Sequence, residues 1–149
     1  MILTGGRIDS VWDGNVDEIV VAKHSVIPDY FKNLKIENLE FAEVCMKDSR
    51  ALVKEDREAI LKAIQENQAD KVLITHGTHT LADTVEFLKE NLRDNKRTIV
   101  LTGASTPLKD FAASDAAFNL GYALAKVEEL PAGIYYCAND KTQTAEEIS

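Results

Sequence analysis

Short apolar runs alternate along this chain with longer stretches whose apolar residues recur every three to four positions. The short runs predict buried strands, and the longer periodic stretches predict amphipathic helices. The predicted strands are residues 1–3, 18–22, 39–46, 71–74, 98–101 and 133–137, and the predicted helices are residues 27–31, 54–65, 81–92 and 111–127. The polar residues after Asn139 predict a loose tail.

Strands that alternate with helices indicate an α/β fold. We expect a doubly wound, mostly parallel sheet with helices on both faces, a Rossmann-like arrangement. The 149 residues, of which 45% are hydrophobic and 28% charged, suit one soluble globular domain. The chain shows no internal repeat and no linker, so the sequence predicts a single domain.

Three predicted strands end in turns that combine a hydroxyl residue with glycine. In a parallel sheet the carboxyl ends of the strands meet at one edge, where clefts form. A helix that follows such a turn also offers free N–H groups and a partial positive charge to a ligand. We therefore expect a ligand site where these turns gather, around Thr4-Gly5-Gly6, Thr75-His76-Gly77-Thr78 and Thr102-Gly103.

These turns, in this order, resemble the N-terminal domain of the bacterial L-asparaginases. The resemblance covers nearly the whole chain, and four motifs lie in register. The motifs are Thr4-Gly5-Gly6-Arg7-Ile8, Asp48-Ser49, His76-Gly77-Thr78-His79-Thr80, and Thr102-Gly103 through Pro107 followed by Ser114-Asp115 through Leu120. The family's second, C-terminal domain has no counterpart here, so we expect residues 1–149 to be a stand-alone domain of the N-terminal type.

The resemblance implies hydrolysis of asparagine or a similar small amide, without a metal or cofactor. It implies catalytic roles for Thr78 and for Lys141, which matches the family's catalytic lysine only if several residues before it are deleted. The residues that the resemblance places against a substrate are Thr4, Gly5, Gly6, Arg7, Ser49, Arg50, Gly77 and His79.

Three departures from the family pattern change the charge of the expected site. Arg7 stands where the family has its first nucleophilic threonine, and a guanidinium cannot attack a carbonyl. His79 replaces the aspartate that grips the substrate ammonium group, and Arg50 replaces a polar amide. Loss of one charge-assisted hydrogen bond costs about 1.5–3 kcal/mol, which disfavours a free amino acid. An alternative function is therefore non-catalytic binding of a small anion, carboxylate or phosphate, by a regulatory domain. A third is a structural subunit that assembles through the sheet edge and helices.

Several of these residues also have plain structural interpretations. Thr78 is either a nucleophile or a helix N-cap. The first glycine turn is either a cradle of N–H groups or a tight turn that needs glycine. Arg7, Arg50 and His79 are either ligand contacts or solvated side chains, and His76 is structural. Asp115 and Asn119 are expected to form a satisfied polar pair.

Charge and composition limit the partners. The formal net charge of −8 opposes general binding to nucleic acid or anionic membranes. No apolar run approaches a membrane span, and no signal peptide is visible. Cys45 and Cys137 have no metal-ligand spacing, and we interpret them as free, buried thiols. We expect a cytoplasmic protein, a small-molecule ligand and, from the family, a homo-oligomer.

Overall fold

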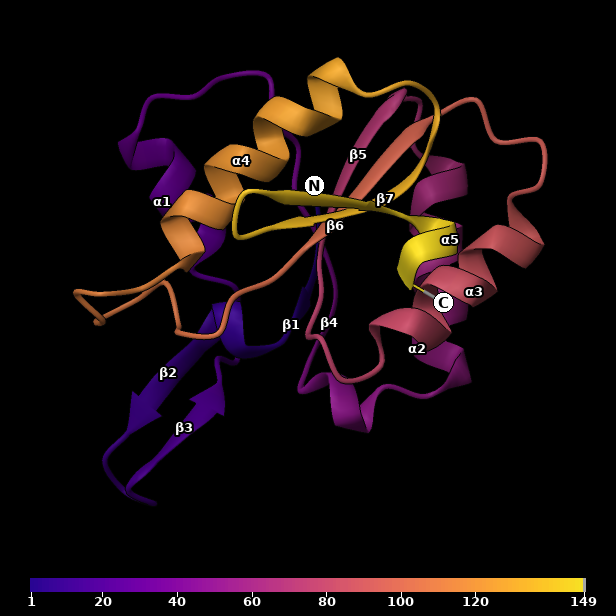
Figure 1. Ribbon diagram of the computed structural model, residues 1–149. Helices are drawn as coiled ribbons and strands as arrows, with labels where there is room; N and C mark the ends of the chain where they lie inside the picture. Colours follow the sequence, from indigo (N-terminus) through magenta and orange to yellow (C-terminus); the bar gives the residue numbers. More distant parts are fainter. Residues whose placement is uncertain (149) are drawn as a thin grey trace.

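A six-stranded sheet forms the centre of the computed structural model, which describes residues 1–148 (Figure 1). The strand order is β4-β1-β5-β6-β7-β8. All neighbours are parallel except β8, which runs antiparallel to β7. The strands are β1 (Ile2–Gly5), β4 (Ala42–Lys47), β5 (Lys71–Thr75), β6 (Thr98–Thr102), β7 (Gly133–Ala138) and β8 (Lys141–Thr144). The predicted mostly parallel sheet is confirmed.

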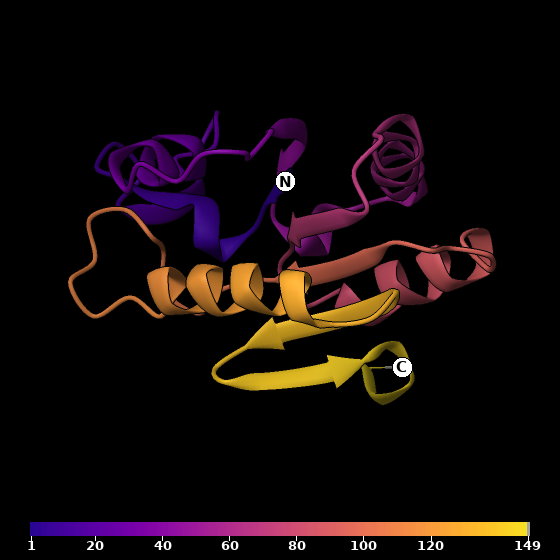
Figure 2. The same cartoon turned by 90° about the horizontal axis from the view of Figure 1, so that it is seen from above.

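Helices cover both faces of this sheet (Figures 1 and 2). Helices α2, α3 and α5 pack on one face, and α1 and α4 pack on the other. The helices are α1 (Ile27–Asn33), α2 (Lys54–Glu66), α3 (Leu81–Asn91), α4 (Ala116–Glu129) and α5 (Ala145–Ile148), with short 3-10 turns η1 (Arg7–Asp9) and η2 (Ser49–Ala51). The predicted α/β architecture with helices on both faces is therefore confirmed.

Strand alternation divides the apolar residues of the sheet between two cores. Ile74 and Leu101 face the α2–α3–α5 side, whereas Leu73 and Val100 face α4. On α2, Ile60 and Ile64 are fully buried, one helical turn apart, as its amphipathic pattern predicts. The two buried layers fix how far each strand reaches and hence where its terminal turn lies.

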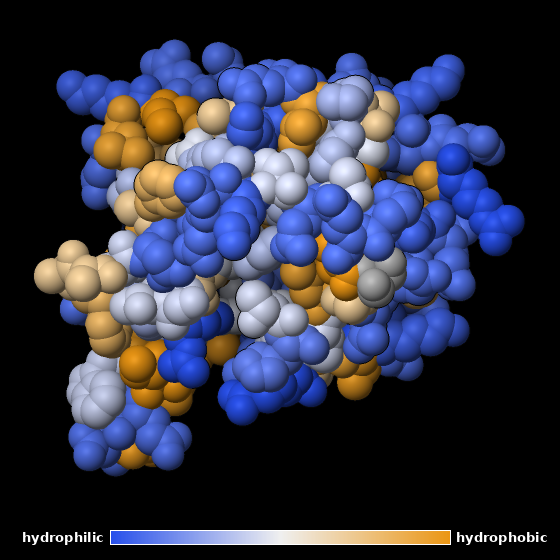
Figure 3. Space-filling view, in the orientation of Figure 1, coloured by the Kyte–Doolittle hydropathy of each residue, from blue (hydrophilic) through white to orange (hydrophobic). Residues whose placement is uncertain are grey.

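The predicted strand at residues 18–22 forms, but outside the central sheet. It is β3 (Glu18–Val21), and it pairs antiparallel with β2 (Ser10–Asp13) in a separate hairpin that projects from the body (Figure 1). Hydrophobic colour gathers over this hairpin in Figure 3, and Trp12 and Val16 are more than half exposed. Strand β2 was not predicted, because Ser10–Asp13 has only two apolar residues.

The prediction of a loose tail after Asn139 is wrong. Asn139 and Asp140 adopt φ values of 52° and 60°, which form a two-residue hairpin turn between β7 and β8. Helix α5 follows, and its Ala145 is buried in the α2–α3 core. Pairing along β7 orders this polar strand, and such pairing leaves no hydrophobic signal in the sequence.

Two predicted boundaries also shift. Strand β4 begins at Ala42 rather than at residue 39, and α4 begins at Ala116 rather than at residue 111. Before α4, the Asp115 carboxylate accepts hydrogen bonds from the Ser105 and Thr106 N–H groups, at 2.9 Å for each shortest contact. This carboxylate ties the loop back to the helix start, which keeps the preceding residues out of the helix.

Both cysteines are free, as expected. Cys137 is buried and Cys45 is half-buried. Burial, together with the nearby negative charge of Asp56, raises the pKa of the Cys45 thiol to about 11. Cys45 is therefore an inert thiol in the folded protein.

Candidate functional site

The carboxyl ends of β1, β4 and β5 meet at one edge of the sheet, which we call the rim. The Gly6 N–H donates to the Lys47 carbonyl at 2.9 Å, which joins the ends of β1 and β4. A β-carbon built on Gly6 would lie 3.0 Å from the Gly77 nitrogen. One built on Gly77 would lie 2.5 Å from the Ser49 Oγ. The three turns are thus in contact, and glycine is required because no side chain fits between them.

The first turn bends through two consecutive glycines with left-handed backbone. Gly5 and Gly6 have φ values of 87° and 78°, which only glycine adopts at little cost. Thr4, just before them, is buried, and its hydroxyl donates to the Thr75 carbonyl at 2.5 Å. Its N–H donates to the Thr75 Oγ1 at 3.2 Å. The Thr4 hydroxyl therefore joins β1 to β5 inside the sheet.

Ser49 supplies a polar group at the centre of the rim. The residue is only 2% exposed, and its hydroxyl, which is not fully enclosed, has no hydrogen-bond partner within residues 1–148. The backbone around it is fixed, because the Thr80 hydroxyl donates to the Ser49 carbonyl at 2.8 Å. The Asp48 side chain also accepts from the Arg50 N–H at 2.9 Å and caps η2. Ser49 therefore presents an unused hydroxyl on a rigid turn.

Thr78 and His79 stand exposed on the turn between β5 and α3. In the described part of the chain, nothing forms a hydrogen bond with the Thr78 hydroxyl. The interpretation of Thr78 as the N-cap of α3 is wrong, because the cap position falls on Thr80 and no side chain caps the helix. The Thr78 carbonyl accepts from the Leu81 N–H at 3.4 Å, so the turn closes through its backbone.

The two arginines of the rim are in different electrostatic situations. Arg50 forms a two-pronged ion pair with Asp48, with Nε to Oδ1 at 3.0 Å and Nη2 to Oδ2 at 2.8 Å. This guanidinium lowers the pKa of Asp48 to about 2, and His79 contributes in the same direction. Arg7 is exposed and has no ion pair among the residues that the structure describes. The excess positive charge is thus smaller than the substitutions alone suggest, and it is centred on Arg7.

Lys141 and Thr78 are not brought together. Lys141 begins β8, opposite Ala138 at the carboxyl end of β7, and it is exposed. Strand β8 lies three places from β5 in the sheet, a separation of about 14 Å at ordinary strand spacing. No hydrogen bond joins the two side chains in residues 1–148.

A buried network behind the β5–α3 turn is mostly invisible in the sequence. His76 is fully buried, with Nδ1 2.6 Å from the Gly77 carbonyl and Nε2 2.9 Å from the Thr84 hydroxyl. The Arg57 Nε donates to the same hydroxyl at 3.2 Å. Burial lowers the pKa of His76 and keeps its ring neutral. His76 is structural, as predicted, but its partners lie on two helices and could not be named from spacing.

Tyr136 is a further rim residue that sequence reasoning missed. A β-carbon built on Gly103 would lie 3.7 Å from the Tyr136 hydroxyl, so the phenol reaches the end of β6. The ring is half-buried against the α2–α3 core. Burial and the nearby Asp115 carboxylate raise the pKa of Tyr136. Strand alternation places residue 136 on this face, but only the fold shows how far along the strand its hydroxyl extends.

Asn119 and Asp115 hold the neighbouring loops, as expected of a satisfied polar pair. The buried Asn119 amide donates to the Gly103 carbonyl at 2.9 Å and to the Asp115 carboxylate at 3.3 Å. Its oxygen accepts from the Asn139 N–H at 2.8 Å. This pair fixes the loops after β6 and β7 relative to each other.

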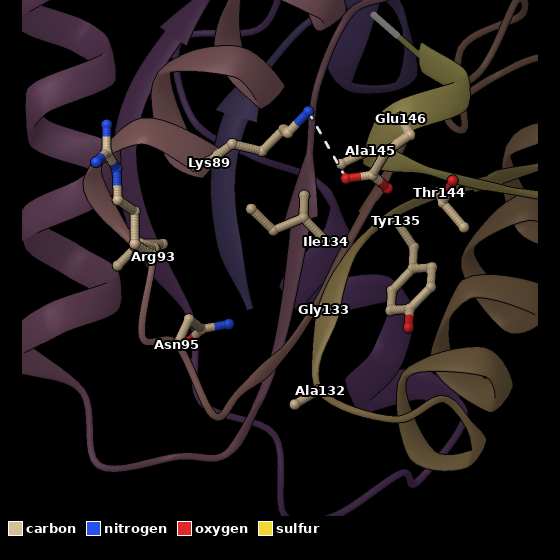
Figure 4. Close-up of a pocket in the computed structure, with 11 residues that line it drawn as sticks. Lys89, Arg93, Asn95, Ala132, Gly133, Ile134, Tyr135, Thr144, Ala145 and Glu146 are labelled. Atoms are coloured by element: carbon tan, nitrogen blue, oxygen red, sulfur yellow. Dashed lines mark ion pairs between the residues drawn. The ribbon is translucent and has the colours of Figure 1, made fainter.

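Two hollows of the surface lie at the opposite end of the sheet from the rim. A cavity of about 370 Å³ lies between α3 and the C-terminal segment, where Lys89 and Glu146 form an ion pair at 3.7 Å across it (Figure 4). It includes Gly133, which begins β7, so it lies far from the rim. A cavity of about 840 Å³ likewise includes Met1 and Lys71, near the start of β1 and β5.

Neither a metal-binding cluster nor a membrane-spanning helix is found among residues 1–148. No group of three or more His, Cys, Asp or Glu side chains in this range is arranged to hold a metal ion. No helix in this range combines the length and the apolar character that a membrane span needs.

Comparison with known proteins places this arrangement among asparaginases. The profile of the family described as "Asparaginase, N-terminal" matches residues 1–149. An L-asparaginase of Thermococcus kodakarensis is 34% identical over 113 residues, which are 74% of this chain and 34% of that protein. The chain thus spans about a third of the length of this curated relative.

Solved structures agree with this match. The thermostable L-asparaginase from Thermococcus kodakarensis superposes with a TM-score of 0.79 at 29% identity, over 97% of this chain and 44% of that one. A probable cytoplasmic L-asparaginase from Campylobacter jejuni gives a TM-score of 0.71 at 27% identity, over 97% and 45%. L-asparaginase I from Vibrio cholerae shares the fold, with a TM-score of 0.73 at 23% identity, over the same shares.

Proposed function

We propose that this chain, which belongs to the asparaginase family through its N-terminal domain, binds a small amino-acid amide or related carboxylate at the rim. The contact of the turns after β1, β4 and β5 around the unpartnered Ser49 hydroxyl supports this proposal most directly. This hydroxyl is not fully enclosed, so it offers an unused donor to a ligand at the rim. The rim therefore has the character of a binding site.

The proposed ligand contacts follow from the groups that are free. The Ser49 hydroxyl donates to one carboxylate oxygen of the ligand. The Arg7 guanidinium, exposed beside Gly6, supplies the positive charge for a carboxylate. The exposed Thr78 hydroxyl faces the side-chain amide.

Hydrolysis in this proposal uses Thr78 as nucleophile. Its oxygen attacks the amide carbon while its proton passes to a base. The amide nitrogen then takes up a proton and leaves as ammonia, and water cleaves the resulting ester to give the acid and restore the hydroxyl. Lys141 is the candidate base, and it reaches Thr78 only if the β7–β8 hairpin moves, because three strand places separate them.

A second candidate function is binding of a small anion without catalysis. Arg7 favours it, because this cation occupies the place of the family's first nucleophile and has no ion pair in the described structure. In this case a dicarboxylate or phosphate binds at the rim in place of asparagine.

Ammonia release separates the two candidates. We expect wild-type protein to release ammonia from asparagine or glutamine, and Thr78→Ala to abolish the release. Arg7→Thr restores a hydroxyl at the first position and is expected to raise the rate. No release above blank from wild type and Arg7→Thr would leave binding as the function.

Calorimetric titration with aspartate, succinate and phosphate tests the ligand. Anion binding predicts that succinate binds at least as tightly as aspartate, and tighter aspartate binding would count against it. Arg7→Met is expected to weaken carboxylate binding about tenfold, the loss of one charge-assisted hydrogen bond. Arg93→Met, which removes an exposed arginine at the other end of the sheet, is the matched control.

Assembly and location complete the proposal. We expect a cytoplasmic homo-oligomer that uses no metal or cofactor and does not bind nucleic acid or membranes. Light scattering coupled to size-exclusion chromatography measures the oligomeric state. A strictly monomeric chain at micromolar concentration would contradict that part.

A further inference from the structure

The network behind the β5–α3 turn has a fixed direction. The Arg57 guanidinium can only donate, so the Thr84 hydroxyl accepts from it at 3.2 Å. The Gly77 carbonyl can only accept, so the proton on His76 is at Nδ1, 2.6 Å from that oxygen. The unprotonated Nε2 then accepts from the Thr84 hydroxyl at 2.9 Å. The chain of donors therefore runs from Arg57 to the Gly77 carbonyl in one sense only.

The direction of these hydrogen bonds fixes the orientation of the peptide group between Gly77 and Thr78. In a planar trans peptide the carbonyl and the N–H point in opposite directions. Because His76 holds the Gly77 carbonyl toward the buried side, the Thr78 N–H points away from the core, on the exposed side of the turn. The Thr78 N–H has no acceptor among the residues that the structure describes, so it is available to a ligand.

We propose that Arg57 is a positioning residue that, through Thr84 and His76, aims the Thr78 N–H at a negatively charged oxygen of the ligand. This inference rests on the proposed function, because it assigns a donor to the same site. Arg57 lies on α2 and does not belong to any rim turn. Its side chain is only 14% exposed and also pairs with Asp83 at 3.4 Å, which holds α2 against α3.

Burial supports a fixed protonation state for this relay. The His76 ring is fully buried, and desolvation and the Arg57 charge lower its pKa, although the Gly77 bond opposes them. The ring thus stays neutral, with one donor and one acceptor nitrogen. A charged ring would place two donors against the Thr84 hydroxyl and the carbonyl, and the relay would lose its direction.

Nitrogen-15 NMR of the histidine rings tests the relay without any activity. The chain has three histidines, and a His76→Asn spectrum assigns the signal. We expect wild-type His76 to be the Nδ1–H tautomer. Thr84→Val removes the donor to Nε2, and we expect a mixture of tautomers and a shifted Thr78 amide signal. Thr84→Ser keeps the hydroxyl and should restore both. An unchanged tautomer and amide signal in folded Thr84→Val would overturn the relay.

Ligand titration tests whether the relay positions the Thr78 N–H for a ligand. We expect Thr84→Val and Arg57→Met to weaken aspartate binding about three- to tenfold, the range for one hydrogen bond, with Thr84→Ser near wild type. Lys62→Met, a change on the same helix at an exposed ion pair, is the control for α2. Equal affinity in all variants would overturn the positioning role. If the NMR signals respond but wild type binds neither aspartate, succinate nor phosphate, the proposed function fails, and with it the ligand role of the Thr78 N–H.

Discussion

The two glycine turns at the centre of the rim lie side by side but are held in different ways. Behind the β5–α3 turn, both ring nitrogens of His76 have partners, and three side chains act in one direction. The β1–η1 turn carries Arg7 without an ion pair, and after it comes Asp9, which is fully buried with Oδ2 unpartnered in residues 1–148. A cation without an ion pair and a carboxylate with an unpartnered oxygen thus lie in or next to the turn that carries Arg7.

The two turns therefore differ in how firmly their side chains are held. The β5–α3 turn keeps the His-Gly-Thr of the family motif, although His79 departs from it, and the network gives a single arrangement to Gly77 and Thr78. After the β1–η1 turn, the Asp9 carboxylate accepts a hydrogen bond at Oδ1 from the Val26 N–H at 2.8 Å, and its Oδ2 has no partner in residues 1–148. A buried carboxylate with a free oxygen is a known cost to stability, which persists in native proteins mostly near functional sites.

The strongest test of the contact between turns is Gly77→Ala. The added methyl group would lie 2.5 Å from the Ser49 Oγ and 2.8 Å from its Cβ, so one of the turns must move. We expect a loss of about 2–3 kcal/mol in the free energy of unfolding, as for an overpacked core, together with loss of ligand binding. Urea denaturation measures the first and calorimetry the second.

Gly121→Ala is the matched control for this variant. A β-carbon at Gly121, in α4, would meet no atom within 4 Å. The substitution should stabilise the helix by about 0.5–1 kcal/mol. Equal effects from the two substitutions would show that the turns are not in contact in solution.

Asp9→Asn tests what the unpartnered Asp9 oxygen costs in stability. Desolvation is the main cause that raises the pKa of Asp9, against the opposing effects of the nearby Ser25 side chain and the Val26 N–H bond, and Glu43 adds to the rise. Because the folded pKa lies above the unfolded 3.8, stability from the neutral acid is complete below about pH 3.8 and falls as pH rises through the folded pKa.

The neutral amide in Asp9→Asn should remove the loss of stability that the ionised carboxylate causes, and should stabilise the protein at pH 7 by about 1 kcal/mol. Unfolding curves between pH 3.5 and 7 measure the difference. Glu43 adds to the rise in the pKa of Asp9, and its own pKa is lowered by hydrogen bonds from the Ser25 N–H and His24, so Glu43→Gln is the companion variant. A variant that is less stable than wild type at every pH would show that Asp9 is satisfied in solution.

Tyr136→Phe extends the comparison along the rim. The phenol reaches the Gly103 turn, so its loss should weaken ligand binding about two- to fivefold, as for one neutral hydrogen bond. Tyr135→Phe is the control, because Tyr135 is on the other face of β7, against α4. Calorimetric affinities that fall equally in both variants would remove Tyr136 from the site.

The smallest expected effect is that of Arg50→Gln. Its ion pair with Asp48 is 64% and 42% exposed, and pairs of this kind contribute less than about 1 kcal/mol. The midpoint of urea denaturation should hardly change, whereas the pKa of Asp48 should rise from about 2, as carbon-13 NMR would show. A large loss of stability would mean that this pair holds the β4 turn in place.

Periodicity predicted the sheet and its helices because burial on two faces leaves a clear apolar signal, as in Leu73 and Ile74 on β5. It could not predict β8 or β2, whose order depends on pairing with a neighbouring strand, although it did predict β3. The meeting of the glycine turns followed from the parallel topology. The side chains that support the rim could not be predicted in this way. Arg57 and Thr84 lie 27 positions apart, and the place of the Tyr136 hydroxyl depends on how far its side chain reaches.

The hairpin that follows Asp9 carries the chain's single tryptophan, Trp12, which is 52% exposed. Its indole sits on β2, directly after the short 3-10 turn that begins at Arg7. The protein therefore has a natural fluorophore close to the motif in which Arg7 replaces the family's threonine. Emission wavelength and quenching by iodide would report on that strand in unlabelled protein, free of background from any other indole.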